Sequence, residues 1–386
     1  MNNIYCDLLY LISCAINNYP ADFKKIETMN LSKIYQLSYQ HSVEAITYKA
    51  LASYIENNQN PNLDELFKKW IEAKNKIIRK TILMDNERNQ LFTYLDKHKI
   101  WYLPLKGIIL STLYPTFGMR QMADNDILFD ASYRQEVHDW FVNHGYHVKS
   151  YLESNHDEYH KKPIYNFEMH TSLFHETAHS QYYQYYKSLK NKLQLKSTQS
   201  FEYTMSDEDF YIYIIVHNFK HYDNSGIGIR SLLDIYVYTQ AKAYLDHHYI
   251  KNELTKINLY SFEQDMYHLS KQIFNPNFNI NSLTKKQQTI LQEMFASNTY
   301  GTIENHWQKQ IKKTYHTVSL SAKLKYLLKR IYPSRHQMIT WCKTQAPFIY
   351  KHPWLMPLAR IKRIIKLNST KRKVIKHEFN TIRKIK

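Results

Sequence analysis

Residues 103–130 read LPLKGIILSTLYPTFGMRQMADNDILFD, and this stretch decides the fold of the chain. It contains a turn glycine at position 107 and an acidic pair, Asp124 and Asp126, directly ahead of an apolar run. Side chains alternate along a strand, so the two carboxylates share one face. Two carboxylates held side by side repel each other unless a cation lies between them. The pattern therefore predicts a site for a hard divalent ion such as Mg²⁺, which usually arrives with substrate phosphates.

The segments around this stretch predict a compact mixed α/β unit. An apolar run at 100–105 is typical of a strand, and the turn at Lys106 and Gly107 leads into a helix over 108–114. Gly107 at such a turn exposes backbone N–H groups to an anion. The pattern further predicts a strand over 126–129, a helix over 133–144, a strand starting at 146 and a strand over 164–173.

The chain as a whole is predicted to be helix-rich. It has 386 residues but only six glycines and ten prolines, a composition typical of long helices. We predict an α+β protein in which a small mixed-sheet core is flanked by helical regions at both ends. The predicted segments are an N-terminal helical region (1–98), an α/β core (99–204), a helical domain (205–300) and a basic helical C-terminal region (301–386).

Cysteine usage and hydropathy favour a cytoplasmic protein. The three cysteines, Cys6, Cys14 and Cys342, form no CxxC pair, so we expect no disulfide framework. The N-terminus lacks a cationic region, and Asp7 interrupts its apolar run, which argues against a signal peptide. No uninterrupted apolar run approaches the roughly 18 residues of a membrane span, so we expect no transmembrane helix.

Positive charge is concentrated at the C-terminal end of the chain. Residues 301–386 hold 21 Lys and Arg against two acids, Glu304 and Glu378, which leaves 31 bases and 32 acids elsewhere. Such a region favours a polyanionic partner. Residues 353–367 place bulky apolar side chains between regularly spaced cations, which suits a helix lying on an anionic membrane surface better than a solvated charge run, and nucleic acid is the less favoured partner. A solvated basic helix without a partner is the alternative.

Several short motifs accompany the acidic pair in a fixed order. They are Leu105-Lys106-Gly107, Leu113-Tyr114-Pro115, Gly118-Met119-Arg120, Asp124-Asn125-Asp126-Ile127-Leu128, Phe167-Glu168-Met169-His170, His217-Asn218-Phe219-Lys220-His221 with Arg230 and Asp234, and Tyr332-Pro333-Ser334. Together they resemble the signature of the uncharacterised nucleotidyltransferase-like proteins of the DNA polymerase-β superfamily. The resemblance covers roughly residues 100–240.

The resemblance implies metal-dependent transfer of a nucleotidyl group from an NTP to a hydroxyl acceptor, with a glycan-related acceptor favoured. It implies that Asp124, Asp126 and Glu168 are the catalytic, metal-binding carboxylates for Mg²⁺ or Mn²⁺, and that Gly107 lies at the phosphate-binding turn. Position 108 is Ile where the superfamily usually has Ser, which removes a hydroxyl donor to the phosphates. Lys106 and Arg120 are then the candidates for cationic contacts to the phosphates.

The remaining candidate residues have two interpretations each. His217, Lys220 and His221 either bind phosphate or acceptor, or they are packing and surface residues of a helix. Arg230 contacts substrate, or it forms an i, i+4 salt bridge with Asp234. A zinc site of His170, His175 and His179 is disfavoured because position 170 lies on a predicted strand and no cysteines accompany the histidines.

Three hypotheses for function remain open on the sequence. The first is a nucleotidyltransferase. The second is a nucleotide-binding protein on a catalytically degenerate nucleotidyltransferase fold, motivated by Ile108. The third is a protein that acts mainly through its basic C-terminal region (301–386), placed on nucleic acid or peripherally at the inner face of the membrane, with 353–386 as the membrane-contacting part.

Overall fold

The computed structural model describes residues 3–58, 60–177, 179–299, 301–315, 319–331, 338–339, 342, 346–365 and 382. Residues 1–220 and 227–299 form one compact unit, and residues 221–226 and 300–386 form a second. The Tyr332-Pro333-Ser334 motif and most of 366–386 lie outside the described residues.

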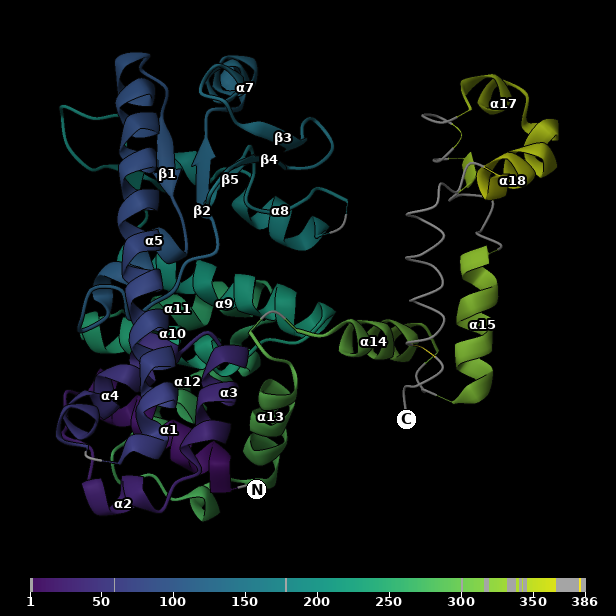
Figure 1. Ribbon diagram of the computed structural model, residues 1–386. Coiled ribbons are helices and arrows are strands. Elements are labelled where there is room, and N and C mark those ends of the chain that lie inside the picture. Colours follow the sequence, from purple (N-terminus) through teal and green to yellow (C-terminus); the bar gives the residue numbers. More distant parts are fainter. Residues whose placement is uncertain are drawn as a thin grey trace. The chain divides into compact units, whose positions relative to one another are not determined.

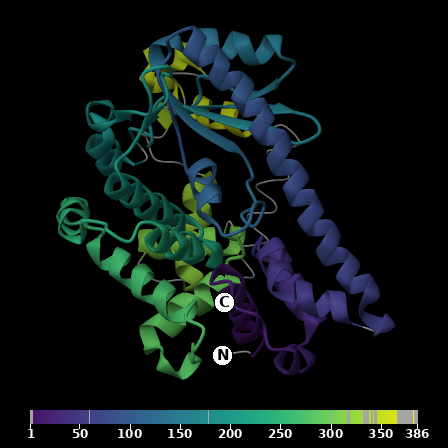
Figure 2. The same ribbon diagram turned by 90° about the vertical axis from the view of Figure 1, so that its left-hand side faces the viewer.

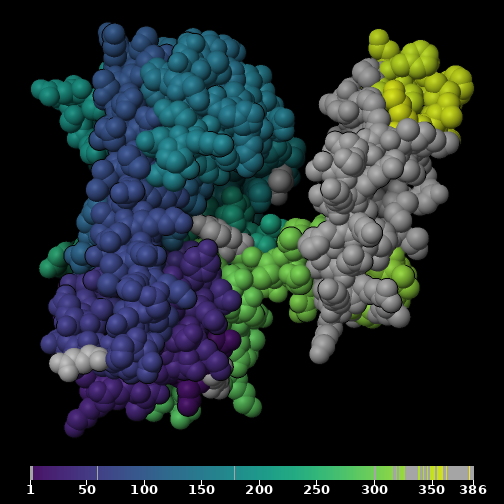
Figure 3. Space-filling model, viewed as in Figure 1, coloured from purple at the N-terminus to yellow at the C-terminus, as the bar shows by residue number. Residues whose placement is uncertain are grey.

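The first unit begins with a helical layer that ends in one very long helix. Apolar residues at helical spacing form the buried sides of these helices, and Leu8, Ile34 and Trp70 are fully buried. Helix α5 contacts both α4 and the sheet strand β5, and it lies alongside both parts (Figures 1 and 2). In the space-filling view α5 forms a continuous blue strip of surface that runs from the sheet part of the unit to its N-terminal helices (Figure 3). The helices are α1 (Asn3–Ile16), α2 (Phe23–Glu27), α3 (Leu31–Gln40), α4 (Glu44–Asn57) and α5 (Asp64–Lys97).

A five-stranded mixed sheet follows, with the strand order β1-β2-β5-β4-β3. The β2–β5 pair is parallel, and the β1–β2, β5–β4 and β4–β3 pairs are antiparallel. A separate two-stranded sheet pairs β6 with β7. The elements are β1 (Tyr102–Pro104), α6 (Gly107–Leu110), β2 (Asn125–Phe129), α7 (Arg134–Asn143), β3 (His147–Ser150), β4 (His156–Lys161), β5 (Tyr165–His170), α8 (Ser180–Tyr186), β6 (Gln194–Leu195) and β7 (Tyr203–Thr204).

One face of the five-stranded sheet is apolar and packs against helices α5 and α7. Ile127, Phe167 and Met169 point to this face and join Leu91 of α5 and Phe141 of α7 in one buried cluster. Since side chains alternate along each strand, the residues between them point to the opposite face. That opposite face carries Asp126 of β2, Glu158 of β4 and Glu168 of β5.

Helices complete the first unit and make up most of the described residues of the second. Ser206 caps helix α9 through its Oγ, which accepts a hydrogen bond from the Asp209 N–H at 3.1 Å, as expected for a helix start. The first unit's later helices are α9 (Asp207–Asn224), which extends into the second unit, α10 (Ile229–Ala241), α11 (His247–Lys256), α12 (Tyr260–Ile273) and α13 (Lys285–Ala296). The second unit contains α14 (Ile303–Tyr315), α15 (Leu320–Ile331), α17 (Pro347–Lys351) and α18 (Met356–Ile365).

The architecture confirms the predicted helix-rich α+β class. The predicted helix over 108–114 is shorter than expected, since α6 gives way to a 3₁₀ turn at Ser111–Leu113. Strand β4 was not predicted from the sequence. The three cysteines are free, and no helix among the described residues is long and apolar enough to cross a membrane. The structure divides the chain into two compact units, and the four segments expected from the sequence stay a prediction.

Candidate active site

Strand pairing brings Asp126 and Glu168 together on the polar face of the sheet. In the parallel β2–β5 ladder Asp126 is the partner of Glu168, and Leu128 is the partner of His170. Paired residues on neighbouring strands point to the same face and lie about 5 Å apart. Two of the three predicted carboxylates therefore converge because β2 and β5 pair in this register.

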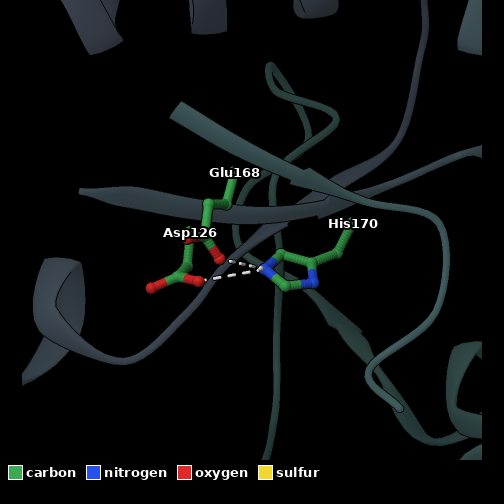
Figure 4. A group of neighbouring side chains, drawn as sticks. All are labelled: Asp126, Glu168 and His170. Atoms are coloured by element: carbon green, nitrogen blue, oxygen red, sulfur yellow. Dashed lines mark hydrogen bonds and ion pairs between the residues drawn. The ribbon is translucent and has the colours of Figure 1, made fainter. Parts of the chain in front are cut away.

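His170 completes a group of three on the same face. Its Nε2 lies 2.9 Å from Asp126 Oδ1 and 3.7 Å from Glu168 Oε2. Figure 4 shows both carboxylates turned toward this nitrogen. Asp126 and His170 are almost fully buried, whereas Glu168 is partly exposed to solvent. An ionised carboxylate can only accept, so the neutral imidazole donates its Nε2–H to Asp126.

Lys106 supplies the positive charge of the site. Its Nζ lies 2.7 Å from Asp126 Oδ1. The residue lies at the turn between β1 and α6 with φ 44° and ψ −113°, a conformation that L residues rarely adopt. Burial acts to lower the pKa of the Lys106 ammonium, but the Asp126 carboxylate outweighs it and raises that pKa overall. Lys106 is therefore a permanent cation in contact with Asp126.

The acidic groups of the site differ in their affinity for protons. Burial acts to raise the pKa of Asp126, but the Lys106 ammonium and the His170 hydrogen bond outweigh it and hold that pKa well below its usual range. Burial and repulsion from ionised Asp126 raise the pKa of Glu168 to about 7. Burial lowers the pKa of His170 to about 4, against the opposing effect of Asp126. At neutral pH Asp126 is ionised, His170 is neutral, and Glu168 is near its midpoint.

Asp124 lies beside this group rather than within it. Strand β2 begins at Asn125, so Asp124 precedes the ladder, and the neighbouring Ala123 carbonyl accepts a hydrogen bond from Lys80 Nζ at 3.3 Å. Burial and repulsion from Asp126 and Glu168 raise the pKa of Asp124 to about 7. The three carboxylates interact electrostatically, but the close ligand group around Asp126 contains Glu168 and His170 and not Asp124.

Helix α9 brings further predicted residues to this region. Lys220 interacts electrostatically with Asp126 and Glu168, and burial together with Lys106 lowers its pKa to about 8. The buried Tyr213, one helical turn before His217, is coupled to the same charges, and its ring centroid lies 6.0 Å from that of His217. His221 belongs to the second unit, and its role in binding phosphate or acceptor stays a prediction.

Arg120 lies directly behind the Gly107 turn. A Cβ at position 107 would lie 2.7 Å from Arg120 Nη1, so the turn leaves room for no side chain. The guanidinium makes a two-point contact with Asp234 of α10, with Nε 2.7 Å from Oδ1 and Nη2 2.9 Å from Oδ2. The Tyr114 hydroxyl donates to Asp234 Oδ1 at 2.8 Å. This buried network fixes the segment between β1 and β2 on the helical part of the unit.

Arg230 lies one turn before Asp234 on α10 and contacts the same segment. Its Nη1 donates to the Gln121 carbonyl at 3.2 Å. Both carboxylate oxygens of Asp234 accept hydrogen bonds from Arg120, which lies 114 positions earlier in the chain. The phosphate-binding roles of Arg120 and Arg230 stay predictions.

The donor set on this face fits a divalent cation. One ligand atom each from Asp126, Glu168 and His170 lies within 4.8 Å of the others. Ligands on opposite sides of a magnesium ion are about 4 Å apart, so small side-chain rotations would bring these atoms into range. Among the described residues, His175 and His179 belong to no group of this kind, so the disfavoured histidine zinc site is not assembled.

A second set of residues on the same face was not predicted from the sequence. Glu158 of β4 pairs with Glu168, and His156 pairs with His170. Strand β4 reads HDEYHK, which has no apolar alternation, so the usual signal of a strand is missing. Arg88 of α5 was also overlooked, although its Nη1 donates to Asn125 Oδ1 at 2.9 Å at the start of β2. The only sequence signal for this second set was a Glu and a His two positions apart, which occurs both at 156–158 and at 168–170.

Comparison with known proteins identifies one family. A family model described as an uncharacterised nucleotidyltransferase matches residues 27–275, which include the whole five-stranded sheet and helices α9 and α10. No curated protein and no solved structure matches the chain. The matched range includes all the residues that form the acidic group.

Proposed function

Because the chain belongs to the family of uncharacterised nucleotidyltransferases, we propose that it moves a nucleoside monophosphate from an NTP to a hydroxyl acceptor in an Mg²⁺- or Mn²⁺-dependent reaction. The observation that carries the proposal is the register that pairs Asp126 with Glu168 beside the Lys106–Gly107 turn. Phosphoryl transfer needs charge neutralisation and in-line positioning more than a covalent nucleophile. The buried carboxylates would hold the ion that neutralises and positions the phosphates, and the fixed Lys106 ammonium adds positive charge beside them.

Asp126 and Glu168, with Asp124 and His170 beside them, would hold the metal. When bound, the ion supplies neutralisation of phosphate charge and polarisation of the attacking and leaving oxygens. Glu168 has a further task in this proposal. As a partly exposed carboxylate next to the metal position, it would accept the proton of the acceptor hydroxyl. Lys106 keeps Asp126 ionised for its role.

The cationic side chains around the carboxylates would bind the triphosphate. Lys106 and Lys220 lie within electrostatic range of Asp126 and Glu168. Ile108 offers no hydroxyl to the phosphates, and its side chain packs against the apolar core of the sheet. In this chain, phosphate binding would therefore depend on lysine charge and on backbone N–H groups at Gly107.

Nucleotide binding by the purified protein tests the proposal. We expect ATP or another NTP to bind in calorimetric titrations only when Mg²⁺ or Mn²⁺ is present. Asp126→Asn, alone and combined with Asp124→Asn, should abolish this binding, whereas Asp139→Asn on the exposed side of α7 should not. Metal-independent binding, or unchanged binding by the double variant, would overturn the proposal. Sugar hydroxyls are the first acceptors to screen for turnover.

Ile108 also supports a second candidate, a catalytically degenerate nucleotide-binding protein. The two candidates differ in their response to Glu168→Gln. A nucleotidyltransferase should lose turnover in this variant while its fold persists. A binding protein should show no turnover with any acceptor, and its function in cells should survive the substitution.

We further propose that the C-terminal unit docks to an anionic membrane surface. Phe348, Trp354 and Leu358 are 68%, 76% and 54% exposed, although they flank a buried apolar cluster that includes Ile349 and Met356. The sequence from 353 to 386 adds 11 Lys and Arg against the single acid Glu378. Exposed bulky side chains beside cations are typical of interfacial helices, which supports peripheral placement at a membrane.

Co-sedimentation with vesicles tests the docking proposal. The full chain should sediment with phosphatidylserine-containing vesicles and not with neutral ones. Trp354→Ala with Leu358→Ser should weaken binding, and Tyr244→Ala, which removes a 99% exposed side chain from the first unit, should not. Truncation before Pro353 should abolish it. Equal binding by the truncated chain would contradict the proposal, and displacement by DNA would favour a nucleic-acid partner instead.

A further inference from the structure

The N-terminal helical layer of the first unit contains a cavity that shares no residue with the candidate active site. It lies between helices α1 and α2 and the segment that follows helix α12. Its volume is about 320 Å³, which is at the lower end of the range typical of small-molecule sites. Asp7 of α1 and Lys25 of α2 are both among its lining residues. The cavity therefore combines opposite charges with room for a small ligand.

Hydrogen bonds between the surrounding segments fix the walls of this cavity. Ser13 Oγ and Asn17 Nδ2 of α1 both donate to the Phe274 carbonyl at the end of α12, at 2.9 Å and 3.0 Å. The Tyr10 hydroxyl accepts a hydrogen bond from the Asp22 N–H at 2.9 Å, which ties the start of α2 to α1. A cavity with fixed walls costs its ligand little reorganisation on binding.

The two charged side chains of the cavity are not neutralised by direct contact. Within the described part of the chain, neither Asp7 nor Lys25 forms an ion pair with the other or with a third side chain. Lys25 Nζ lies 3.5 Å from the centroid of the Tyr10 ring, and this cation–π contact holds the ammonium at the cavity. Asp7 is partly buried and Lys25 is exposed, so a ligand can reach both from solvent.

The segment after α12 adds hydrogen-bond donors to the cavity. Asn275 and Asn279 each accept the backbone N–H two residues later through Oδ1, at 2.9 Å and 3.0 Å. As far as the structure describes the chain, their Nδ2 groups have no acceptor, so both remain available to an anionic group. Ile273 and Phe278 supply apolar lining beside them.

We infer that this cavity is a binding site for an α-amino acid with an apolar side chain. The ammonium of the ligand would pair with Asp7, its carboxylate would pair with Lys25, and its side chain would contact Ile273 and Phe278. A ligand with a single charge would leave either Asp7 or Lys25 without a partner, which favours a zwitterion. This inference goes beyond the proposed function and does not depend on it.

Calorimetric titration of the full chain with L-leucine, L-methionine and L-phenylalanine tests the inference, with no metal or nucleotide present. At least one of the three should bind at millimolar concentration or below. The amide of that amino acid lacks the carboxylate, and its N-acetyl derivative lacks the ammonium. Each derivative should bind about tenfold more weakly or worse, because one charge-assisted contact is lost. This comparison uses the wild-type protein only, so it does not depend on whether a variant folds.

Two substitutions remove the charges of the cavity and keep the size of the side chains. Asp7→Asn and Lys25→Met should each weaken binding by about tenfold or more. Lys24→Met changes the neighbouring exposed lysine of α2, which does not line the cavity, and should bind as wild type does. Thermal unfolding without ligand checks that each variant is folded.

Three results would overturn the inference. They are the absence of binding by all three amino acids, equal binding by the amide or N-acetyl derivative, and wild-type affinity in both folded variants, Asp7→Asn and Lys25→Met. Each of them would leave metal-dependent nucleotide binding untouched, because that activity is placed on the five-stranded sheet. Amino-acid binding by a protein that binds no nucleotide would support this site and contradict the nucleotidyltransferase proposal.

Discussion

The Lys106 ammonium lies 2.7 Å from Asp126 Oδ1, and the chain holds Lys106 in a backbone conformation that usually requires glycine. Strained backbone of this kind costs about 1–3 kcal/mol and persists where the surrounding structure fixes it. Here β1 on one side, and the close approach of Arg120 to Gly107 on the other, fix the turn. The strain is the cost of directing a cation onto a buried carboxylate.

Replacing Lys106 separates the ion pair from the strain. Lys106→Ala should lower the free energy of unfolding by about 2 kcal/mol, because it leaves the nearly buried Asp126 carboxylate without its main partner. Lys106→Gly loses the same ion pair but relieves the positive φ, so it should be more stable than Lys106→Ala by about 1 kcal/mol. Urea denaturation at pH 7 measures both values. A glycine variant less stable than the alanine variant would show that the turn is unstrained.

The pH dependence of stability should report the raised pKa of Glu168. Between the unfolded value near 4.5 and the folded value of about 7, the folded protein binds more protons, so this residue's contribution to stability falls as pH rises. In EDTA, wild type should therefore lose stability relative to Glu168→Gln between pH 5 and pH 8, by on the order of 2 kcal/mol. Denaturant titrations of both proteins at each pH measure the difference.

Glu153→Gln, at an exposed position, serves as the control for that comparison and should show a constant difference from wild type across the same pH range. Addition of Mg²⁺ or Mn²⁺ at pH 8 should restore wild type, because a cation neutralises the ionised carboxylates. Parallel curves for wild type and Glu168→Gln would contradict the assignment.

The buried Arg120–Asp234 pair should be strongly coupled. Arg120→Ala or Asp234→Ala leaves one charge buried without its partner, so each should cost about 3 kcal/mol of unfolding free energy. The double variant should cost much less than the sum of the two, because neither charge then remains. Tyr114→Phe removes one hydrogen bond to Asp234 and should cost about 1 kcal/mol. Urea denaturation measures these losses. A loss in the double variant equal to the sum of the two single losses would contradict the coupling.

Gly107→Ala should conflict with the Arg120 guanidinium. The new Cβ would lie 2.7 Å from Nη1, and two-point contact with Asp234 keeps that nitrogen from moving away. We expect a cost of about 1–3 kcal/mol in wild type. The same substitution in an Arg120→Ala background should cost clearly less. Thermal and urea denaturation measure the loss of stability in both backgrounds. An equal loss in the two would show that the Arg120 side chain is not what the new Cβ meets.

The sequence determined the class of the fold, and it predicted Asp126 and Glu168 as site carboxylates, but it did not predict that His170 rather than Asp124 completes their close group. Helical spacing of apolar residues predicts helices wherever one face is buried, and the ordered motifs from Lys106 to Asp234 identify the family. The apolar alternation at Ile127 and Phe129 predicts strand β2, because one of its faces packs on a core. These features are local in the chain, so sequence patterns record them.

The tertiary structure alone decided which side chains meet. Strand β4 has no apolar alternation because one face points to the polar site and the other includes Asp157, which is buried against Arg134. Neither the pairing of His156 with His170 nor that of Asp234 with Arg120 follows from spacing along the chain. Register between strands and contacts between distant segments depend on how whole elements pack. A local pattern cannot encode them, and they place Glu168 at the centre of the site.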